Sequence, residues 1–213
     1  MKIYLIRHGE SEHNVDRNLM AHIHDSKFAL TEKGKKQAEL TAEFMKDKLT
    51  EKSIFYVSPY LRTMQTAQAI YAKAPKSVPF YESPLIREWE LGNLYDFNDR
   101  PPELKREFKA AGAFYFRYHH GESMADVYLR ASLFYSTVVQ RLEAQQKYDK
   151  LIVVSHAAFI EMVKGFLMNW TVERMTDFKP VENGSVTLLG EIDGEYHAEK
   201  IFVPEVDKVE SRP

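Results

Sequence analysis

The chain has 213 residues, of which 44% are hydrophobic and 28% are charged, a balance typical of a globular protein with one substantial core. Its 29 basic and 31 acidic residues leave a formal net charge of −2, which argues against nucleic acid or an anionic membrane as a partner. The absence of cysteine excludes disulfides and thiolate catalysis, and because the N-terminal apolar run is too short for a signal peptide we expect a cytoplasmic protein.

In the first half of the chain, apolar runs and helix caps predict alternating elements: a strand at 2–6, a helix at 31–49, a strand at 54–57, a helix at 59–73 and a strand at 78–81. Thr31 is a favourable N-cap for the first of these helices. Pro59 suits the first turn of the second. A polar segment at 10–29 connects the first strand to the first helix.

The second half continues the alternation, with a helix at 103–111, a helix capped by Ser123, a strand at 151–154, a helix at 157–168 and closing strands at 185–189 and 196–203. Asp126 stands at the third position of the helix that follows Ser123, where it completes a capping box, and we expect it to pair with Arg130 four residues later. The whole pattern predicts an α/β fold: a three-layer sandwich with a mostly parallel central sheet and helices on both faces.

We expect a single domain over residues 1–204, with an insertion at about 93–121 and a polar tail at 205–213. Residues 93–120 contain seven aromatic side chains and are too long for an ordinary connection. Two interpretations stay open, namely a lid over a binding site and a helical decoration that covers the sheet.

Charged side chains follow four apolar runs at the points where the runs end. Arg7 and His8 follow the first run, Arg62 lies in the first turn after the second, and Glu88 and His156 follow two others. Because the carboxyl ends of parallel strands meet at one edge of a sheet, we expect these side chains to converge on one pocket. Guanidinium and imidazole groups beside helix N-termini suit a dianionic phosphoryl group, and an imidazole at this edge can act as a nucleophile.

Four segments, in order along the chain, resemble the histidine phosphatase superfamily, which includes cofactor-dependent phosphoglycerate mutases, the fructose-2,6-bisphosphatase domain and broad-range phosphatases. The matching segments are residues 5–11 with Asn14, residues 58–63, residues 88–92 and residues 154–157. The resemblance runs from residue 3 to about residue 190. It implies a phosphoglycerate mutase-like fold.

The resemblance also implies roles for particular residues. His8 would be the nucleophile that becomes phosphohistidine, and Glu88 would be the general acid and base. The transferring group would be clamped by Arg7, Arg62 and His156. The positions expected to line the substrate pocket are Ser11, Asn14, Met20, Ala21 and Ala157. No cofactor is expected, because the cationic side chains already supply the countercharge that phosphoryl transfer needs.

Two alternatives concern individual residues. Glu90 competes with Glu88 as the acid, although the spacing to Gly92 favours Glu88. The second alternative is a metal site formed by His13, His22 and His24, but no carboxylate motif accompanies these histidines. We therefore expect no metal and place these three histidines at the pocket rim or in solvent.

The balance between phosphatase and mutase rests on two segments. Met20 and Ala21 occupy the region where the mutases carry a Ser-Gly or Thr-Gly pair, and residues 114–128 resemble a branch of broad-range phosphatases. We predict a metal-independent phosphomonoesterase that acts on a small phosphorylated metabolite and also binds inorganic phosphate. The alternatives are a cofactor-dependent phosphoglycerate mutase, a catalytically silent phosphate-binding module and a protein-tyrosine phosphatase, and the sequence does not predict the oligomeric state.

Overall fold

A computed structural model describes residues 1–92, 102–177 and 179–206. Part of the predicted insertion, residues 93–101, and most of the predicted tail, residues 207–213, lie outside the described residues.

Within the described residues the sheet has six strands in the order β3-β2-β4-β1-β5-β6. Their bounds are β1 Lys2–Arg7, β2 Ser53–Val57, β3 Phe80–Glu82, β4 Lys150–Ser155, β5 Val186–Ile192 and β6 Glu195–Phe202. The first four strands are parallel to one another, while β5 is antiparallel to both β1 and β6. The mostly parallel sheet is therefore confirmed.

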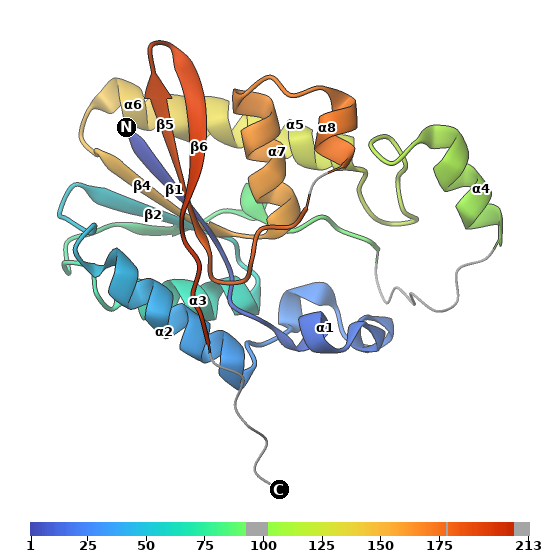
Figure 1. The fold of residues 1–213 in the computed structure, drawn as a ribbon, viewed down its shortest axis with the longest axis horizontal. Coiled ribbons are helices and arrows are strands. Elements are labelled where there is room, and N and C mark those ends of the chain that lie inside the picture. Colours follow the sequence, from blue (N-terminus) through green and yellow to red (C-terminus); the bar gives the residue numbers. More distant parts are fainter. Residues whose placement is uncertain (93–101, 178, 207–213) are drawn as a thin grey trace, which may run out of the picture.

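Helices cover both faces of this sheet, as predicted. Figure 1 shows α2 and α3 on one side and α5, α6 and α7 on the other, with α4 standing away from the sheet. The α-helices are α1 Glu12–Val15, α2 Glu32–Lys46, α3 Leu61–Tyr71, α4 Pro102–Ala111, α5 Met124–Phe134, α6 Gln140–Gln145, α7 Ala157–Leu167 and α8 Val172–Thr176. Short 3₁₀ helices lie at η1 Arg17–Ala21, η2 Asp25–Lys27 and η3 Pro84–Ile86, and a π-helical turn, η4 Tyr135–Val139, joins α5 to α6.

The alternation of side chains along the central strands divides the core into two layers. Ile3 and Leu5 of β1 face the cluster formed with α5 and α7. Tyr4 and Ile6, on the opposite face, join the cluster formed with α2 and α3. Every residue from Leu151 to Ser155 is buried, which explains why this strand reads as a continuous apolar run.

Two helix caps form as predicted, because they depend on local sequence alone. The hydroxyl oxygen of Thr31 accepts a hydrogen bond from Gly34 N at 3.0 Å. Ser123 and Asp126 form the expected capping box at the start of α5. Several boundaries differ from the prediction: α2 ends at Lys46 rather than at 49, and β5 continues to Ile192 rather than ending at 189. Helix α3 begins at Leu61 with Tyr60 as its N-cap, so Pro59 precedes it. The third strand begins after Pro79, a residue without an N–H to donate to a sheet ladder.

The predicted pair between Asp126 and Arg130 was also wrong. The Asp126 carboxylate accepts from Ser123 N at 2.7 Å within the capping box and pairs with Arg117 at 2.6 Å. Arg130 instead pairs with Glu122, the residue before the Ser123 cap, at 2.8 Å. Asp126 is engaged in the helix cap, and Arg130 is drawn to the buried carboxylate of Glu122 instead.

One close backbone contact joins the segment after β1 to helix α2. A Cβ atom at Gly34 would overlap the carbonyl oxygen of Glu10, and a Cβ at Gly9 would overlap the carbonyl oxygen of Gly34. Only glycine at both positions lets the two backbones approach so closely. The start of α2 therefore fixes the path of the chain directly after His8.

Within the described residues, no helix combines the length and the apolar character needed to cross a bilayer. The helix of the insertion, α4, has no buried residue.

Candidate active site

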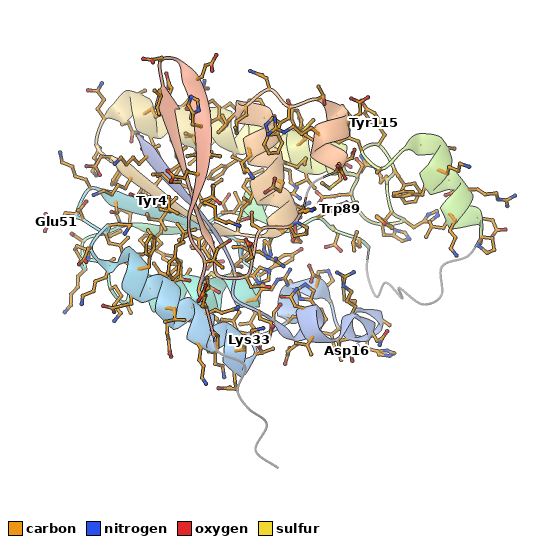
Figure 2. All side chains as sticks on the ribbon, viewed as in Figure 1. Tyr4, Asp16, Lys33, Glu51, Trp89 and Tyr115 are labelled. Atoms are coloured by element: carbon orange, nitrogen blue, oxygen red, sulfur yellow. The ribbon has the colours of Figure 1, made fainter. Side chains whose placement is uncertain are left out.

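The ends of the parallel strands bring the predicted residues to one edge of the sheet. Arg7 is the register partner of Ser155 across β1 and β4, so His8 and His156 leave the sheet side by side. His8 N donates to Ser155 O at 3.0 Å, and the rings of His8 and His156 meet edge to face at 5.1 Å between centroids. Figure 2 shows Trp89 at this end of the molecule and Glu51 at the opposite end.

The hydrogen bonds of His8 define its tautomer. Its Nδ1 lies 2.7 Å from Gly9 O, a carbonyl that only accepts, so Nδ1 carries the proton. Its Nε2 receives the Nε–H of Arg62 at 3.2 Å, and a guanidinium only donates. The lone pair of His8 is therefore on Nε2. The ring is 1% exposed and is held from both sides.

Arg62 is oriented by an acidic residue that the sequence analysis did not single out. Its Nη2 pairs with Asp25 Oδ2 at 3.0 Å, and its Nη1 donates to Asp25 O. Arg62 is fully buried and Asp25 is 9% exposed. The pair leaves Arg62 Nε directed at His8. No sequence pattern marks Asp25, because it lies in η2, a three-residue 3₁₀ helix too short to show a hydrophobic period.

Three buried polar atoms at this edge have no partner among the described residues: Arg7 Nε, His156 Nδ1 and Ser185 Oγ, whose backbone carbonyl accepts from Arg7 N. The other ring nitrogen of His156, Nε2, lies 2.8 Å from the Ser58 hydroxyl, which follows β2. When Nε2 accepts from this hydroxyl, Nδ1 carries the proton and is a donor. Buried donors are almost always paired in folded proteins. An anion bound beside His8 would accept from Arg7 Nε and His156 Nδ1.

Glu88 approaches the cluster from the segment after η3. Its Oε1 accepts from Ala158 N at 3.2 Å, in the first turn of α7, and from Trp89 N at 3.0 Å. Burial raises the pKa of Glu88, and the Trp89 N–H opposes that rise only in part. A raised pKa keeps a carboxyl protonated to higher pH than a free one, which suits Glu88 to donate a proton.

Glu90, the competing carboxylate, has different partners. Its Oε2 accepts from the Tyr60 hydroxyl at 3.3 Å and lies 3.8 Å from His24 Nε2. These contacts bridge the segment after η3 to α3 and to η2.

Three imidazoles at the site are held neutral. Burial, helped by the Arg62 charge, holds the pKa values of His8 and His156 well below the ordinary value. The same causes lower the pKa of His13 to about 4. His13 Nδ1 contacts the Ser11 hydroxyl at 2.8 Å, and its ring lies 6.2 Å from that of His8.

This neutrality gives a stability prediction. Below pH 6.5 the unfolded chain protonates these histidines while the folded chain does not, so the unfolding free energy falls as pH falls. Between pH 6.5 and 5, His13 alone contributes a loss of roughly 2 kcal/mol. The raised pKa of Glu88 has the opposite effect, because it makes the unfolding free energy rise as pH falls. One carboxyl offsets only part of the loss from three imidazoles.

Urea unfolding at pH 7, 6 and 5 measures the effect. His13→Gln should reduce the loss, and the exposed His22→Gln should leave it unchanged. Inorganic phosphate should also reduce it, because a bound anion favours charged imidazoles. Equal pH dependence in the wild type and in His13→Gln would contradict the assignment.

A cavity of about 350 Å³ opens beside the cluster. Of the five positions predicted to line the substrate pocket, Asn14, Met20 and Ala157 line this cavity. Ser11 and Ala21 are not among its lining residues, and the Ser11 hydroxyl bonds to His13 and Asn14 instead. The lining also includes Arg7, His13, Arg17, Asp25, Glu88, Trp89, Leu91, Tyr118, Ala158 and Pro180. The cavity thus joins charged groups at the sheet edge to an aromatic and apolar wall.

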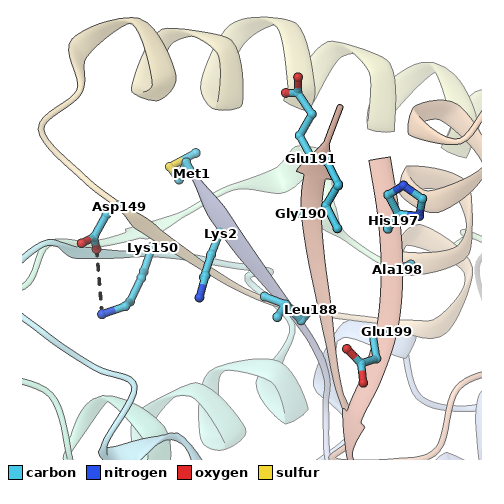
Figure 3. Close-up of a pocket in the computed structure, with 11 residues that line it drawn as sticks. Met1, Lys2, Asp149, Lys150, Leu188, Gly190, Glu191, His197, Ala198 and Glu199 are labelled. Carbon is cyan, nitrogen blue, oxygen red and sulfur yellow. Dashed lines mark ion pairs between the residues drawn. The ribbon is translucent and has the colours of Figure 1, made fainter. Parts of the chain in front are cut away.

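A larger cavity, of about 610 Å³, lies at the opposite edge of the sheet, where β1 and β4 begin (Figure 3). Leu188 and Ala198 give it an apolar lining, and Lys150 pairs with Asp149 at 4.0 Å on its rim. This cavity contains none of the residues that converge at the carboxyl edge.

The candidate metal ligands do not gather at one point. His24 caps η2, accepting from Ser26 N at 3.3 Å, and His22 is exposed. Over the described ranges, no three His, Cys, Asp or Glu side chains are placed to hold a metal ion together.

A mostly parallel sheet with helices on both faces, and with paired histidines and arginines at its carboxyl edge, defines a phosphoglycerate mutase-like α/β protein. The chain belongs to the histidine phosphatase superfamily (branch 1), whose family model matches residues 3–203. The resemblance seen in the sequence is thereby confirmed.

Known relatives include phosphatases. The chain is 31% identical over 198 residues to the phosphoglycerate mutase-like protein AT74H of Arabidopsis thaliana, covering 83% of this chain and 70% of that protein. It is 24% identical over 282 aligned positions to the broad-range acid phosphatase DET1 of Saccharomyces cerevisiae, covering 88% and 84%. Among solved structures, a putative alpha-ribazole-5'-P phosphatase from Escherichia coli superimposes with a TM-score of 0.75 at 21% identity, over 94% of this chain and 95% of that one.

Proposed function

We propose that this protein is a metal-independent phosphomonoesterase that hydrolyses a small phosphorylated metabolite through a phosphohistidine on His8. The observation that supports it most is the arrangement around His8 Nε2. Its lone pair faces the Arg62 Nε–H, and Arg7 Nε and His156 Nδ1 are buried nearby without a partner. A phosphoryl group can use all of these groups at once.

In the first step, the Arg62 Nε–H transfers its hydrogen bond from His8 Nε2 to a phosphoryl oxygen. The freed Nε2 lone pair then attacks phosphorus, and the bond from phosphorus to the ester oxygen breaks. Arg7, Arg62 and His156 donate to the phosphoryl oxygens. Glu88 gives its proton to the departing oxygen, so the product is a neutral alcohol. His8 Nδ1 keeps its proton throughout and continues to donate it in the hydrogen bond to Gly9 O.

In the second step, the Glu88 carboxylate takes a proton from water as the water oxygen attacks phosphorus. The N–P bond breaks and its electron pair returns to His8 Nε2, which releases phosphate. Glu88 is protonated again and ready for the next substrate. One carboxyl therefore serves both steps.

Phosphate release from a panel of phosphomonoesters tests the proposal, with sugar phosphates, phosphoglycerates, nucleotides and phosphotyrosine each assayed in excess EDTA. We expect turnover of at least one class without added metal, and inhibition by vanadate as a mimic of the five-coordinate transition state. Activity lost in EDTA and restored by zinc or magnesium would contradict metal independence.

The same panel separates the alternatives. Interconversion of phosphoglycerates without phosphate release would identify a mutase. Tight binding of inorganic phosphate without turnover of any ester would identify a silent binding module.

A further inference from the structure

Arg130 is a buried charged residue that the proposed chemistry does not use. It lies on α5, and its side chain is 8% exposed. Removing a guanidinium from water is costly unless every donor finds a partner. The partners of Arg130 therefore indicate what the residue is for.

All five N–H donors of Arg130 are engaged. Nε and Nη2 bind the two carboxylate oxygens of Glu122, each at 2.8 Å. Nη1 donates to Leu85 O at 2.7 Å and to Arg87 O at 3.0 Å, and Nη2 also donates to Glu88 O at 3.3 Å. Three of its acceptors are thus backbone carbonyls of the segment that carries the proposed general acid.

The carbonyl between these positions is also held. Ile86 O accepts from the Ser155 hydroxyl, at the end of β4, at 2.7 Å. Four consecutive carbonyls, those of residues 85–88, are therefore bound by side chains rather than by a helix or a sheet ladder. These contacts fix the path of the backbone at Glu88, while the N–H groups of Ala158 and Trp89 hold its carboxyl.

Glu122 secures the residues that follow Glu88. Its backbone N donates to Glu90 O at 2.8 Å, and its backbone carbonyl accepts from Trp89 Nε1 at 2.7 Å. Its carboxylate accepts from Glu90 N at 3.3 Å and pairs with Arg87. Glu88 is thus bracketed by contacts to one buried Arg–Glu pair.

We propose that Arg130, anchored by Glu122, is a positioning residue that holds the segment of residues 85–90 so that the Glu88 carboxyl meets the ester oxygen of the substrate. This inference rests on the proposed function of Glu88. A misplacement of about 1 Å at a reacting group can cost on the order of 100-fold in rate.

The first test compares two leaving groups in Arg130→Lys. Lysine keeps the charge beside Glu122 but cannot reach three carbonyls in the fixed geometry of a guanidinium. We expect kcat/KM for an alkyl phosphate, which reports the steps up to formation of the phosphohistidine, to fall on the order of 100-fold. The kcat/KM for 4-nitrophenyl phosphate, whose leaving group needs no acid, should change only slightly. Equal losses on both substrates would overturn the inference.

Arg117→Lys is the matched control. Arg117 pairs with Asp126 at the start of the same helix, but its side chain is 62% exposed and contacts the cap rather than the Glu88 segment. Both rates should stay at the wild-type level. A leaving-group effect in this variant equal to that of Arg130→Lys would also overturn the inference.

A double-mutant cycle separates positioning from a general structural role. In a Glu88→Gln background, Arg130→Lys should cause little further loss on the alkyl substrate, because the group it positions is already removed. The same fold-loss in both backgrounds would show that Arg130 acts through something other than Glu88. If Arg130→Lys does not fold, Glu122→Gln replaces it, with the same expected dependence on the leaving group.

Failure of the proposed function gives a different result. If Glu88→Gln alone shows no dependence on the leaving group, Glu88 is not the acid, whatever Arg130 does. If the wild-type protein hydrolyses no phosphomonoester, the proposed activity itself is wrong.

Discussion

His8→Ala should lower kcat by several orders of magnitude while inorganic phosphate still binds. The substitution removes the nucleophilic Nε2, and Arg7, Arg62 and His156 remain to hold the anion. Rapid quench of wild-type enzyme with ³²P-labelled substrate should leave a protein-bound label that is stable in base and lost in acid, as expected for a phosphoramidate. His8→Ala should give no label.

His13→Gln provides the control for His8→Ala, because it removes a neighbouring half-buried imidazole that the chemistry does not require. It should still form the acid-labile label. An acid-stable label on a serine, or full turnover by His8→Ala, would rule out the phosphohistidine.

Glu88→Gln should slow alkyl phosphate hydrolysis on the order of 10²- to 10⁴-fold, the usual contribution of a general acid. The loss in kcat/KM should be small for aryl phosphates, because a nitrophenolate leaves without a proton. Steady-state kcat/KM on matched alkyl and aryl substrates measures the difference, since it reports only the steps up to formation of the phosphohistidine and leaves out the second step, in which Glu88 acts as a base on every substrate. Glu90→Gln should show no such dependence, since Glu90 contacts Tyr60 instead.

The pH dependence follows from the same carboxyl. Glu88 must begin the first step protonated, so the wild-type kcat/KM on alkyl substrates should fall as pH rises through its raised pKa. This limb of the profile should be absent in Glu88→Gln. If Glu90→Gln removes it instead, the acid lies two residues further along the chain.

If the acid is neither Glu88 nor Glu90, the next candidates along the chain are Asp96 and Glu122. Glu122 is engaged by Arg87 and Arg130 and does not line the site cavity. Asp96 lies outside the described residues.

The convergence of the charged residues could be predicted because it depends on strand direction alone. Once β1, β2 and β4 are parallel, the residues that follow them must meet at one edge, as Arg7 and Ser155 do. The caps at Thr31 and Ser123 were predictable for a similar reason, since each is complete within four residues.

The contacts that orient the site were less accessible to sequence reasoning. Asp25 reaches Arg62 from a three-residue 3₁₀ helix 37 residues earlier, which is too short for periodicity to fix side-chain direction. Arg130 was assigned to a pair along its own helix, because spacing rules treat that helix as if it stood alone. In the folded protein, the backbone carbonyls of a neighbouring segment compete for the same guanidinium, and burial favours them.

The contact between Gly34 and Glu10 has a consequence for protein engineering. Glycine within a helix is a usual target for stabilisation, because replacing it with alanine commonly gains up to about 1 kcal/mol. In α2 the added methyl group would push the helix away from the chain that follows His8. A thermostability screen that measures only unfolding would not detect the effect of Gly34→Ala on the position of His8. Gly34 should therefore be kept fixed, like the site residues, when a mutant library is designed.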